Sequence, residues 1–348
     1  MTDRRAELEA AIDRDPYDTT AYAILGDFLQ QIGDPRGELI ALQIAAVEHP
    51  IAEVAANTYL YDRADEFTAG LPTKLRRSNA GRVVWRNGFI HKAVAADLEL
   101  RELLAHASAR FLVDLAIDHG ASFDVVVCTL VESPVATLRI LSLGCHTQQD
   151  LGTLDDLWPA VARLRQLFIH GDPTFAAIAL PELERLAISV RELRSETVEA
   201  LARTGWPVLR ELALRTAAGR TSTRQLAALL AGTAMPNLVS LALNYPDLDQ
   251  LIEPLAAGSI ARGLRSLDVS NIGYSVPQQH RLLTDAGARL IARHASAFPM
   301  LDVLDVSGNR LTSVGLAALA GIATTLRADH QRNDDDIADE RDWDLYDY

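Results

Sequence analysis

The chain has 348 residues, 49% of them hydrophobic, and a formal net charge of −14. This length exceeds one ordinary compact domain, but an elongated array of repeats has no such size limit. The acidic charge argues against nucleic acid as the main partner, because phosphate contacts require clustered cations.

The expected compartment follows from three absences in the sequence. The two cysteines, Cys128 and Cys145, are too few for a disulfide framework, which favours a reducing compartment. The first residues are charged throughout and lack the apolar core of a signal peptide. No apolar run reaches the length of a membrane span. We therefore expect a cytoplasmic protein without a membrane partner.

Residues 1–70 show helical spacing of apolar side chains, and we predict a small all-α domain there. One apolar stripe runs from Tyr22 to Ile32. Gly33 follows it as a helix-terminating glycine, and Asp34 is suited to cap the next helix. After Pro50, a further helix is suggested by Val54, Tyr61 and Phe67.

The block Asp34–Gln43, D-P-R-G-E-L-I-A-L-Q, carries a family resemblance. Together with Leu25-Gly26-Asp27-Phe28-Leu29 it resembles the repeat-companion domain at the start of many bacterial repeat proteins. Phe28 stands where that family usually has Trp. The resemblance implies a bacterial protein with repeats downstream, and it implies no activity. A helix start with local ion pairs is favoured over a binding site for Asp34, Arg36 and Glu38.

Residues 71–111 are predicted to be a basic connector and the N-terminal cap strand of an array. Residues 71–96 contain six cations and no acidic residue. The cations are Lys74, Arg76, Arg77, Arg82, Arg86 and Lys92. Trp85-Arg86-Asn87-Gly88-Phe89-Ile90 resembles the junction that follows the companion domain and is expected to begin the first strand. The cations form either a docking surface or a solvated connector, with Trp85 covering the end of the core.

Residues 112–328 carry a recurring leucine pattern, L-x-x-L-x-L, with Ile or Val allowed in the last place. It begins at Leu112, Leu138, Leu164, Leu183, Leu209, Leu238, Leu264 and Leu301, at separations of 26, 26, 19, 26, 29, 26 and 37 residues. Each copy predicts a strand and a turn, followed in most copies by an amphipathic helix. The inner apolar row of one copy is covered only when neighbours stack on it. We therefore predict an α/β solenoid, with a curved parallel sheet and outer helices.

The connections between the strands are predicted from the same spacing. Helices are expected around residues 151–157, 198–201, 226–230 and 248–255. The 19-residue step contains Pro173 and Pro181 and leaves room for one helical turn at most. The 37-residue step contains a polar insertion near residues 271–281, which we expect to be a loop.

Leu311-Thr312-Ser313-Val314-Gly315-Leu316 and Leu283-Thr284-Asp285-Ala286-Gly287-Ala288 carry a second resemblance. Both are close to the L-T-x-x-G-x helix start of ribonuclease-inhibitor-like leucine-rich repeats, and the chain resembles that family. Thr284 and Thr312 are then expected to cap helices. Asn309 is expected to bond backbone groups of neighbouring turns. Asn271 and Cys145 lie one position early for this role.

Residues between the inward leucines are expected to face the concave side of the array. Small residues in the middle column would let a partner approach closely. Phe168 and His170, near Arg185, suggest an aromatic and arginine anchor. The candidate partner-binding residues are Gln166, Phe168, His170, Arg185, Glu211, Arg215, Asn244, Asp268 and Asp305. The alternative is an unused, solvated strand face.

Residues 329–348 contain nine acidic residues and two arginines, a local charge of −7. This composition predicts a disordered acidic tail. The aromatic and apolar residues in the tail indicate docking more than solubility alone. They are Trp343, Leu345, Tyr346 and Tyr348.

The sequence shows no catalytic, cofactor-binding or metal-binding motif. It lacks a zinc-protease helix motif, a Gly-rich phosphate loop and a nucleophile elbow, and its histidines lack metal-ligand spacing. Cys145 and His146 are adjacent, but neighbours on an extended chain usually point apart. Cys145 is better explained as a turn residue in place of Asn.

We therefore expect a non-catalytic scaffold or adaptor that binds another protein through the array, as a monomer or in a hetero-complex, and that uses no cofactor. One alternative is a regulatory subunit or sensor whose acidic tail inhibits the protein or docks a partner enzyme. The third hypothesis is a thiol enzyme using Cys145.

Overall fold

The structure, a computed structural model, describes residues 2–76, 81–119, 123–145, 149–218, 223–245, 247–271 and 282–332. Contacts divide the chain into two compact units. Unit 1 contains residues 1–145 and 156–164, and unit 2 contains residues 146–155 and 165–348. The boundaries expected at residues 70 and 111 fall inside unit 1. The four tail-docking residues, Arg77 and residues 272–281 of the insertion lie outside the described residues.

Unit 1 begins with helices, as predicted for residues 1–70, and a further short helix at residues 73–76 lies in the segment predicted to be the connector. They are α1 (Thr2–Arg14), α2 (Thr19–Gln31), α3 (Arg36–Ala45), α4 (Pro50–Asp62), α5 (Ala64–Thr68) and α6 (Thr73–Arg76). Asp18 caps α2 by accepting hydrogen bonds from the Thr20 and Ala21 N–H groups. Gly33 follows α2 with a φ of 77°, a conformation that glycine adopts without strain. Buried side chains of α1, α2 and α3 pack with Phe89 and Phe111 into one core.

The helix predicted after Pro50 is present, but two of the apolar residues that indicated it face solvent and not the core. α4 ends at Asp62, and Phe67 lies buried on the separate helix α5. Val54 and Tyr61 are 67% and 82% exposed. The reason is that α4 packs on α3 with a different side of the helix, where Ala56 is buried.

The block from Trp85 to Ile90 forms a hairpin. β1 (Val83–Arg86) pairs antiparallel with β2 (Phe89–Ala96). The connecting residues Asn87 and Gly88 both have positive φ, 49° and 77°, as the tight turns of two-residue hairpins require. Trp85 packs edge-on against Phe67, with 6.2 Å between ring centroids.

The block Asp34–Gln43 holds this hairpin turn. Arg36 is buried and donates hydrogen bonds to the Gly88 carbonyl at 2.7 Å and to Ser108 Oγ at 3.1 Å. Its guanidinium lies 4.7 Å from the Phe89 ring centroid. Gln43 Oε1 accepts a hydrogen bond from the Gly88 N–H at 2.7 Å. The expectation of local ion pairs is therefore wrong for Arg36, whose partners come from distant parts of the chain.

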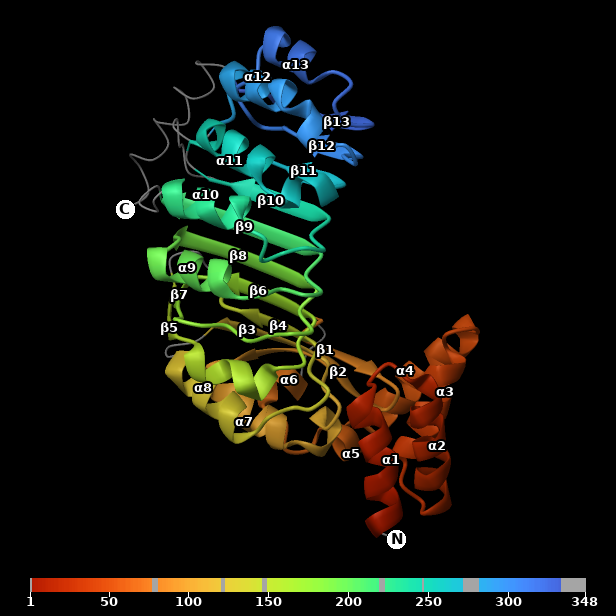
Figure 1. The fold of residues 1–348 in the computed structure, drawn as a ribbon. Coiled ribbons are helices and arrows are strands. Elements are labelled where there is room, and N and C mark those ends of the chain that lie inside the picture. Colours follow the sequence, from red (N-terminus) through yellow and green to blue (C-terminus); the bar gives the residue numbers. More distant parts are fainter. Residues whose placement is uncertain are drawn as a thin grey trace, which may run out of the picture. The chain divides into compact units, whose positions relative to one another are not determined.

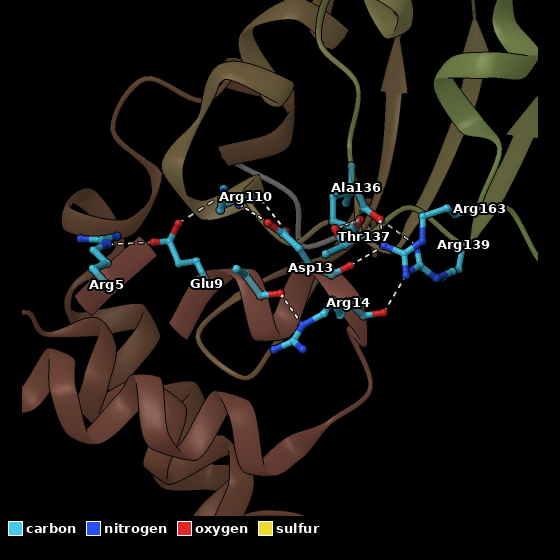
Figure 2. Close-up of polar contacts among 11 residues, drawn as sticks. Arg5, Glu9, Asp13, Arg14, Arg110, Ala136, Thr137, Arg139 and Arg163 are labelled. Carbon is cyan, nitrogen blue, oxygen red and sulfur yellow. Dashed lines mark hydrogen bonds and ion pairs between the residues drawn. The ribbon is translucent and has the colours of Figure 1, made fainter. Parts of the chain in front are cut away.

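Two arginines fix the C-terminal end of α1 (Figure 2). Arg110 donates to the two carboxylate oxygens of Asp13, at 2.8 and 2.6 Å. Arg163 donates to the main-chain oxygens of Asp13 and Arg14. Carbonyls at a helix C-terminus lack intrahelical partners. An arginine there donates hydrogen bonds to them, and its positive charge interacts favourably with the helix dipole.

Unit 1 then continues with alternating helices and strands. They are α7 (Asp97–Ala105), β3 (Asp114–His119), α8 (Phe123–Glu132) and β4 (Ile140–Leu143). β2, β3 and β4 are parallel neighbours in that order. Leu115, Ile117, Leu141 and Leu143 are buried, as the leucine pattern predicts.

Unit 2 is built on a long parallel series of strands. They are β6 (Gln166–His170), β8 (Arg185–Glu192), β9 (Glu211–Ala218), β10 (Ser240–Asn244), β11 (Ser266–Asp268), β12 (Val303–Asp305) and β13 (Thr325–Arg327). The helices between them are α9 (Ser195–Arg203), α10 (Thr223–Ala231), α11 (Ile252–Ala257), α12 (Asp285–Arg293) and α13 (Ser313–Leu319). The helices lie along one side of these strands (Figure 1). The predicted parallel α/β arrangement with outer helices is present in this unit.

A single leucine row runs across these strands. Register places Leu167, Leu186, Leu212, Leu241, Leu267 and Leu304 opposite one another, strand by strand. Each of them is at most 2% exposed. Full burial of each such side chain contributes roughly 1.5–3 kcal/mol, which requires a neighbour on both sides.

The connections differ from the prediction at one place. Residues 151–157 were expected to be helical, but they form β5 (Asp150–Thr153) and part of a 3-10 helix, Asp155–Val161. Gly152 has a φ of 63° and Pro159 lacks an N–H, so an α-helix cannot run through. The 19-residue step contains no helix, which agrees with the prediction of one turn at most. It contains β7 (Asp172–Thr174), which pairs with β5.

Asn309 has the predicted role in the turns. Its side chain is buried, and Nδ2 donates to the carbonyls of Val269 at 2.8 Å and Val306 at 2.9 Å. Its Oδ1 accepts a hydrogen bond from the Leu283 N–H at 2.9 Å. One amide therefore connects three segments of the array.

The L-T-x-x-G helix starts are linked through aspartates of the preceding repeat. Thr284 and Thr312 cap α12 and α13, as predicted. The Thr312 N–H and hydroxyl also donate to Asp285, at 2.9 and 2.6 Å. A Cβ at Gly315 would overlap Asp285 Oδ1. Asp249 makes the same contacts with Thr284 and Gly287. The glycine of the motif thus leaves room for a carboxylate that caps the next helix.

This arrangement predicts a pH effect on stability. Hydrogen bonds from Thr312 hold the pKa of Asp285 below its ordinary value of 3.8. A depressed carboxyl pKa stabilises the folded protein above the ordinary pKa, and that contribution disappears as the pH falls through the folded pKa. We expect Asp285→Asn to lower the free energy of unfolding at neutral pH. The difference from wild type should shrink below about pH 4.

Urea unfolding between about pH 7 and about pH 3 measures this difference. Asp302→Asn is the matched control, because its carboxylate lies in an exposed ion pair with Arg265 at 3.0 Å. Parallel stability curves for wild type and Asp285→Asn would contradict the prediction.

Candidate functional site

The nine candidate partner-binding residues all lie in unit 2. They occupy strand positions that alternate with the buried leucines. We refer to these nine as the strand face. Register places Gln166, Arg185 and Glu211 side by side across β6, β8 and β9. A second row contains His170, Arg215 and Asn244, with Ser189 between the first two. The residues that the sequence groups together are therefore neighbours in the fold.

A middle row of side chains runs between these two rows, and the side chains at its centre are small. It runs from Phe168 through three alanines to Asp268 and Asp305. The alanines are Ala187, Ala213 and Ala242. Phe168 is half-buried at one end of this track. A backbone or helix of another molecule could approach the alanines closely and contact the ring.

Arg185 and Glu211 form a fork-like ion pair on the strand face. Arg185 Nε lies 2.6 Å from Glu211 Oε2, and Nη2 lies 2.8 Å from Oε1. Donation to Glu211 raises the pKa of Arg185. The two side chains are 41% and 44% exposed, so the pair remains accessible from solvent. The bidentate geometry fixes where the positive and the negative group of the pair lie on the surface.

His170 is favoured in its neutral form. Burial lowers the pKa of His170, and the positive charge of Arg215 lowers it further. His170 is half-buried, follows Phe168 by two residues on β6, and is opposite Ser189 in register. A neutral imidazole offers one donor and one acceptor, which suits a polar contact beside an apolar anchor.

Three further residues of the strand face make contacts within the protein. Asn244 is only 7% exposed, and its Nδ2 donates to Asn271 Oδ1 at 2.8 Å. Asp268 and Asp305 each accept a hydrogen bond from a turn N–H two residues later. Asp268 also lies 3.9 Å from Arg215. These side chains order the strand ends, and the more exposed charged members of the strand face are Arg185, Glu211 and Arg215, at 41%, 44% and 43%.

One residue of this surface is not apparent in the sequence. Arg327 on β13 is the register neighbour of Asp305, and the two side chains lie 3.9 Å apart. In the sequence, β13 is indicated by Leu326 alone, which is the register neighbour of Leu304. The leucine pattern has no first leucine here, because Ala323 stands three residues before Leu326.

The basic residues of the connector are largely paired with acidic residues of unit 1. Arg82 lies 3.2 Å from Asp118, Lys92 lies 3.0 Å from Asp114, and Arg76 lies 3.1 Å from Asp65. Lys74 is on α6 and Arg86 is exposed at the end of β1. The segment has no acidic residue of its own, but strands and helices beside it supply the counter-charges.

Neither cysteine is in a disulfide. Burial, with the charge of Asp118, raises the pKa of the Cys145 thiol, which disfavours the nucleophilic thiolate. Within the described ranges, no cluster of His, Cys, Asp and Glu could hold a metal ion. In the same part of the chain, no helix combines the length and apolarity needed to cross a bilayer.

Comparison with known proteins gives the fold and no activity. No protein-family model matches the chain, and no curated protein matches it significantly. Among solved structures, it is similar to a crystal structure of a Bacteroides fragilis protein from a structural genomics programme. The TM-score is 0.57 at 16% sequence identity, over 83% of this chain and 87% of that one. At this identity the similarity is one of fold alone.

Proposed function

We propose that this protein is a leucine-rich-repeat scaffold or adaptor of a bacterial cytoplasm that binds another protein through the strand face. The observation that carries the proposal is the alanine track beside Phe168, His170 and the Arg185–Glu211 pair. An aromatic anchor, a bidentate arginine and a polar rim are typical of protein-binding surfaces. The parallel strands and outer helices of unit 2 support the repeat assignment.

A catalytic role is not favoured by the chemistry at Cys145. A thiol nucleophile is activated by a lowered pKa or by an adjacent base, whereas the Cys145 thiol has a raised pKa.

The ion pair allows a test that separates binding from folding. The double variant Arg185→Glu/Glu211→Arg keeps an opposite-charge pair across β8 and β9 but reverses its direction. We expect this swap to weaken partner binding more than tenfold, because a partner charge matched to one side then meets a like charge. The free energy of unfolding should change by less than about 1 kcal/mol, since exposed pairs contribute little.

The measurement is quantitative pull-down from a lysate of the native host, with wild type and the swap variant compared by mass spectrometry. The matched control is Arg265→Asp/Asp302→Arg, an exposed pair at 3.0 Å whose residues are outside the strand face. If the swap variant retains a partner as well as wild type does, the Arg185–Glu211 pair is not part of the binding site for that partner.

A further inference from the structure

Exposed apolar side chains are concentrated on the helical part of unit 1. Among the described residues, fourteen large hydrophobic side chains are exposed, and seven of them lie between Tyr17 and Tyr61. The four most prominent of these are Val47, Ile51, Val54 and Tyr61, with exposures of 76%, 85%, 67% and 82%. We name the three of them that lie on α4, which are Ile51, Val54 and Tyr61, the α4 stripe. A scattered exposed apolar residue is normal, but a contiguous group marks a contact surface.

The three residues of the α4 stripe share one face of the helix. Ile51, Val54 and Tyr61 are spaced by three and seven residues, which keeps them within one side of a 3.6-residue helix. The opposite side contains Ala56, which is buried, and Tyr59, whose hydroxyl donates to the Pro35 carbonyl at 3.2 Å. α4 therefore packs on unit 1 without using the α4 stripe, and the stripe is not explained by the fold.

The sequence on either side of the α4 stripe is acidic. Residues 37–62 contain Glu38, Glu48, Glu53 and Asp62 and no lysine or arginine. On the N-terminal side the nearest cation, Arg36, is buried. On the C-terminal side Arg63 forms an ion pair with Glu66 at 3.1 Å. An apolar stripe with an acidic border complements an apolar surface with a basic border.

We propose that the α4 stripe is a docking site for an amphipathic helix of a partner protein, with an apolar face flanked by lysine or arginine. The stripe on α4 extends about 15 Å, which corresponds to about three turns of the partner helix. A second copy of this chain fits less well, because a two-fold contact would bring two acidic borders together. An anionic membrane surface is disfavoured by the same repulsion. This site is separate from the strand face and does not depend on the proposed function.

The test uses the full chain and a synthetic peptide of about 18 residues, with leucine at i, i+3, i+4 and i+7 and lysine elsewhere. Two control peptides keep its length. One has the same composition with the leucines scrambled, and one keeps the leucine spacing but replaces lysine by glutamate. Fluorescence anisotropy at about 0.1 M salt gives each Kd, so that long-range attraction to the net charge is largely screened.

The expected result is that the helical leucine–lysine peptide binds at least tenfold more tightly than either control peptide. Ile51→Ser/Tyr61→Ser should raise its Kd at least tenfold, and so should Glu48→Lys/Asp62→Lys. The matched control is Leu98→Ser on α7, which removes an apolar side chain that is 83% exposed elsewhere in unit 1. It should leave the Kd within twofold.

Three results would overturn the proposal. Equal binding of the scrambled peptide would show attraction by charge alone. An unchanged Kd in Ile51→Ser/Tyr61→Ser would place the peptide elsewhere. A dimer in sedimentation velocity that dissociates in this variant would assign the α4 stripe to a second copy. Circular dichroism checks that the variants remain folded, as expected for exposed positions.

Discussion

Asn309→Ala is expected to lower the free energy of unfolding by about 3 kcal/mol. The substitution removes the partners of the Leu283 N–H and the Val269 carbonyl, which Asn309 bonds at 2.9 and 2.8 Å in a fully buried position. An unsatisfied buried donor or acceptor costs about 1–3 kcal/mol, and two are created here. The Val306 carbonyl keeps a hydrogen bond from Gln331 at 2.9 Å, so it adds little to the loss.

Chemical denaturation with urea measures this loss, with Asn237→Ala as the control. Asn237 is exposed and donates one hydrogen bond to the Pro207 carbonyl at 2.7 Å. The control should cost less than about 1 kcal/mol, as surface substitutions usually do. Equal losses at the two positions would show that Asn309 does not connect the turns energetically.

Gly88→Ala is expected to destabilise unit 1 by about 3 kcal/mol or more. Gly88 has a φ of 77°, which costs a residue with a Cβ about 1–2 kcal/mol. A Cβ there would also lie 2.5 Å from Ile40 Cγ1 and 3.2 Å from Arg36 Cγ. Relieving this overlap would separate the hairpin turn from α3, at a further cost of about 1–3 kcal/mol.

Gly33→Ala separates the two contributions. Gly33 has the same φ of 77°, but an added Cβ would meet nothing within 4 Å. Gly33→Ala should therefore lower the free energy of unfolding only by the cost of the positive φ, about 1–2 kcal/mol. Urea unfolding gives the free energies, and hydrogen exchange over residues 83–96 reports separation of the hairpin. If both variants lose the same amount, the turn is not packed tightly against α3.

The structure also shows why sequence patterns located strands better than surfaces. The strand positions and the buried leucine row follow from a period that each repeat carries in its own residues. Thr284 and Thr312 could be identified as caps because a cap contacts N–H groups only two residues away. The partners of Arg36 and Arg82 are 52 and 36 residues distant in the chain, so no local pattern indicates them.

The side of α4 that meets the core is a similar case. Val54 and Tyr61 have the spacing of a core stripe, and the structure exposes both. Apolar spacing defines one face of a helix but not the direction in which that face points. The packing partner determines the direction, and here α3 contacts the side that contains Ala56.

For this protein, the sequence by itself determined the helical beginning, the parallel repeated strands and the turn role of Asn309, because each depends on residues within one repeat or one helix turn. Only the tertiary structure decided which charges are neutralised, which members of the strand face remain accessible, and that α4 leaves an apolar stripe exposed. Those features arise where distant segments pack together, and neighbouring residues in the chain carry no record of that packing.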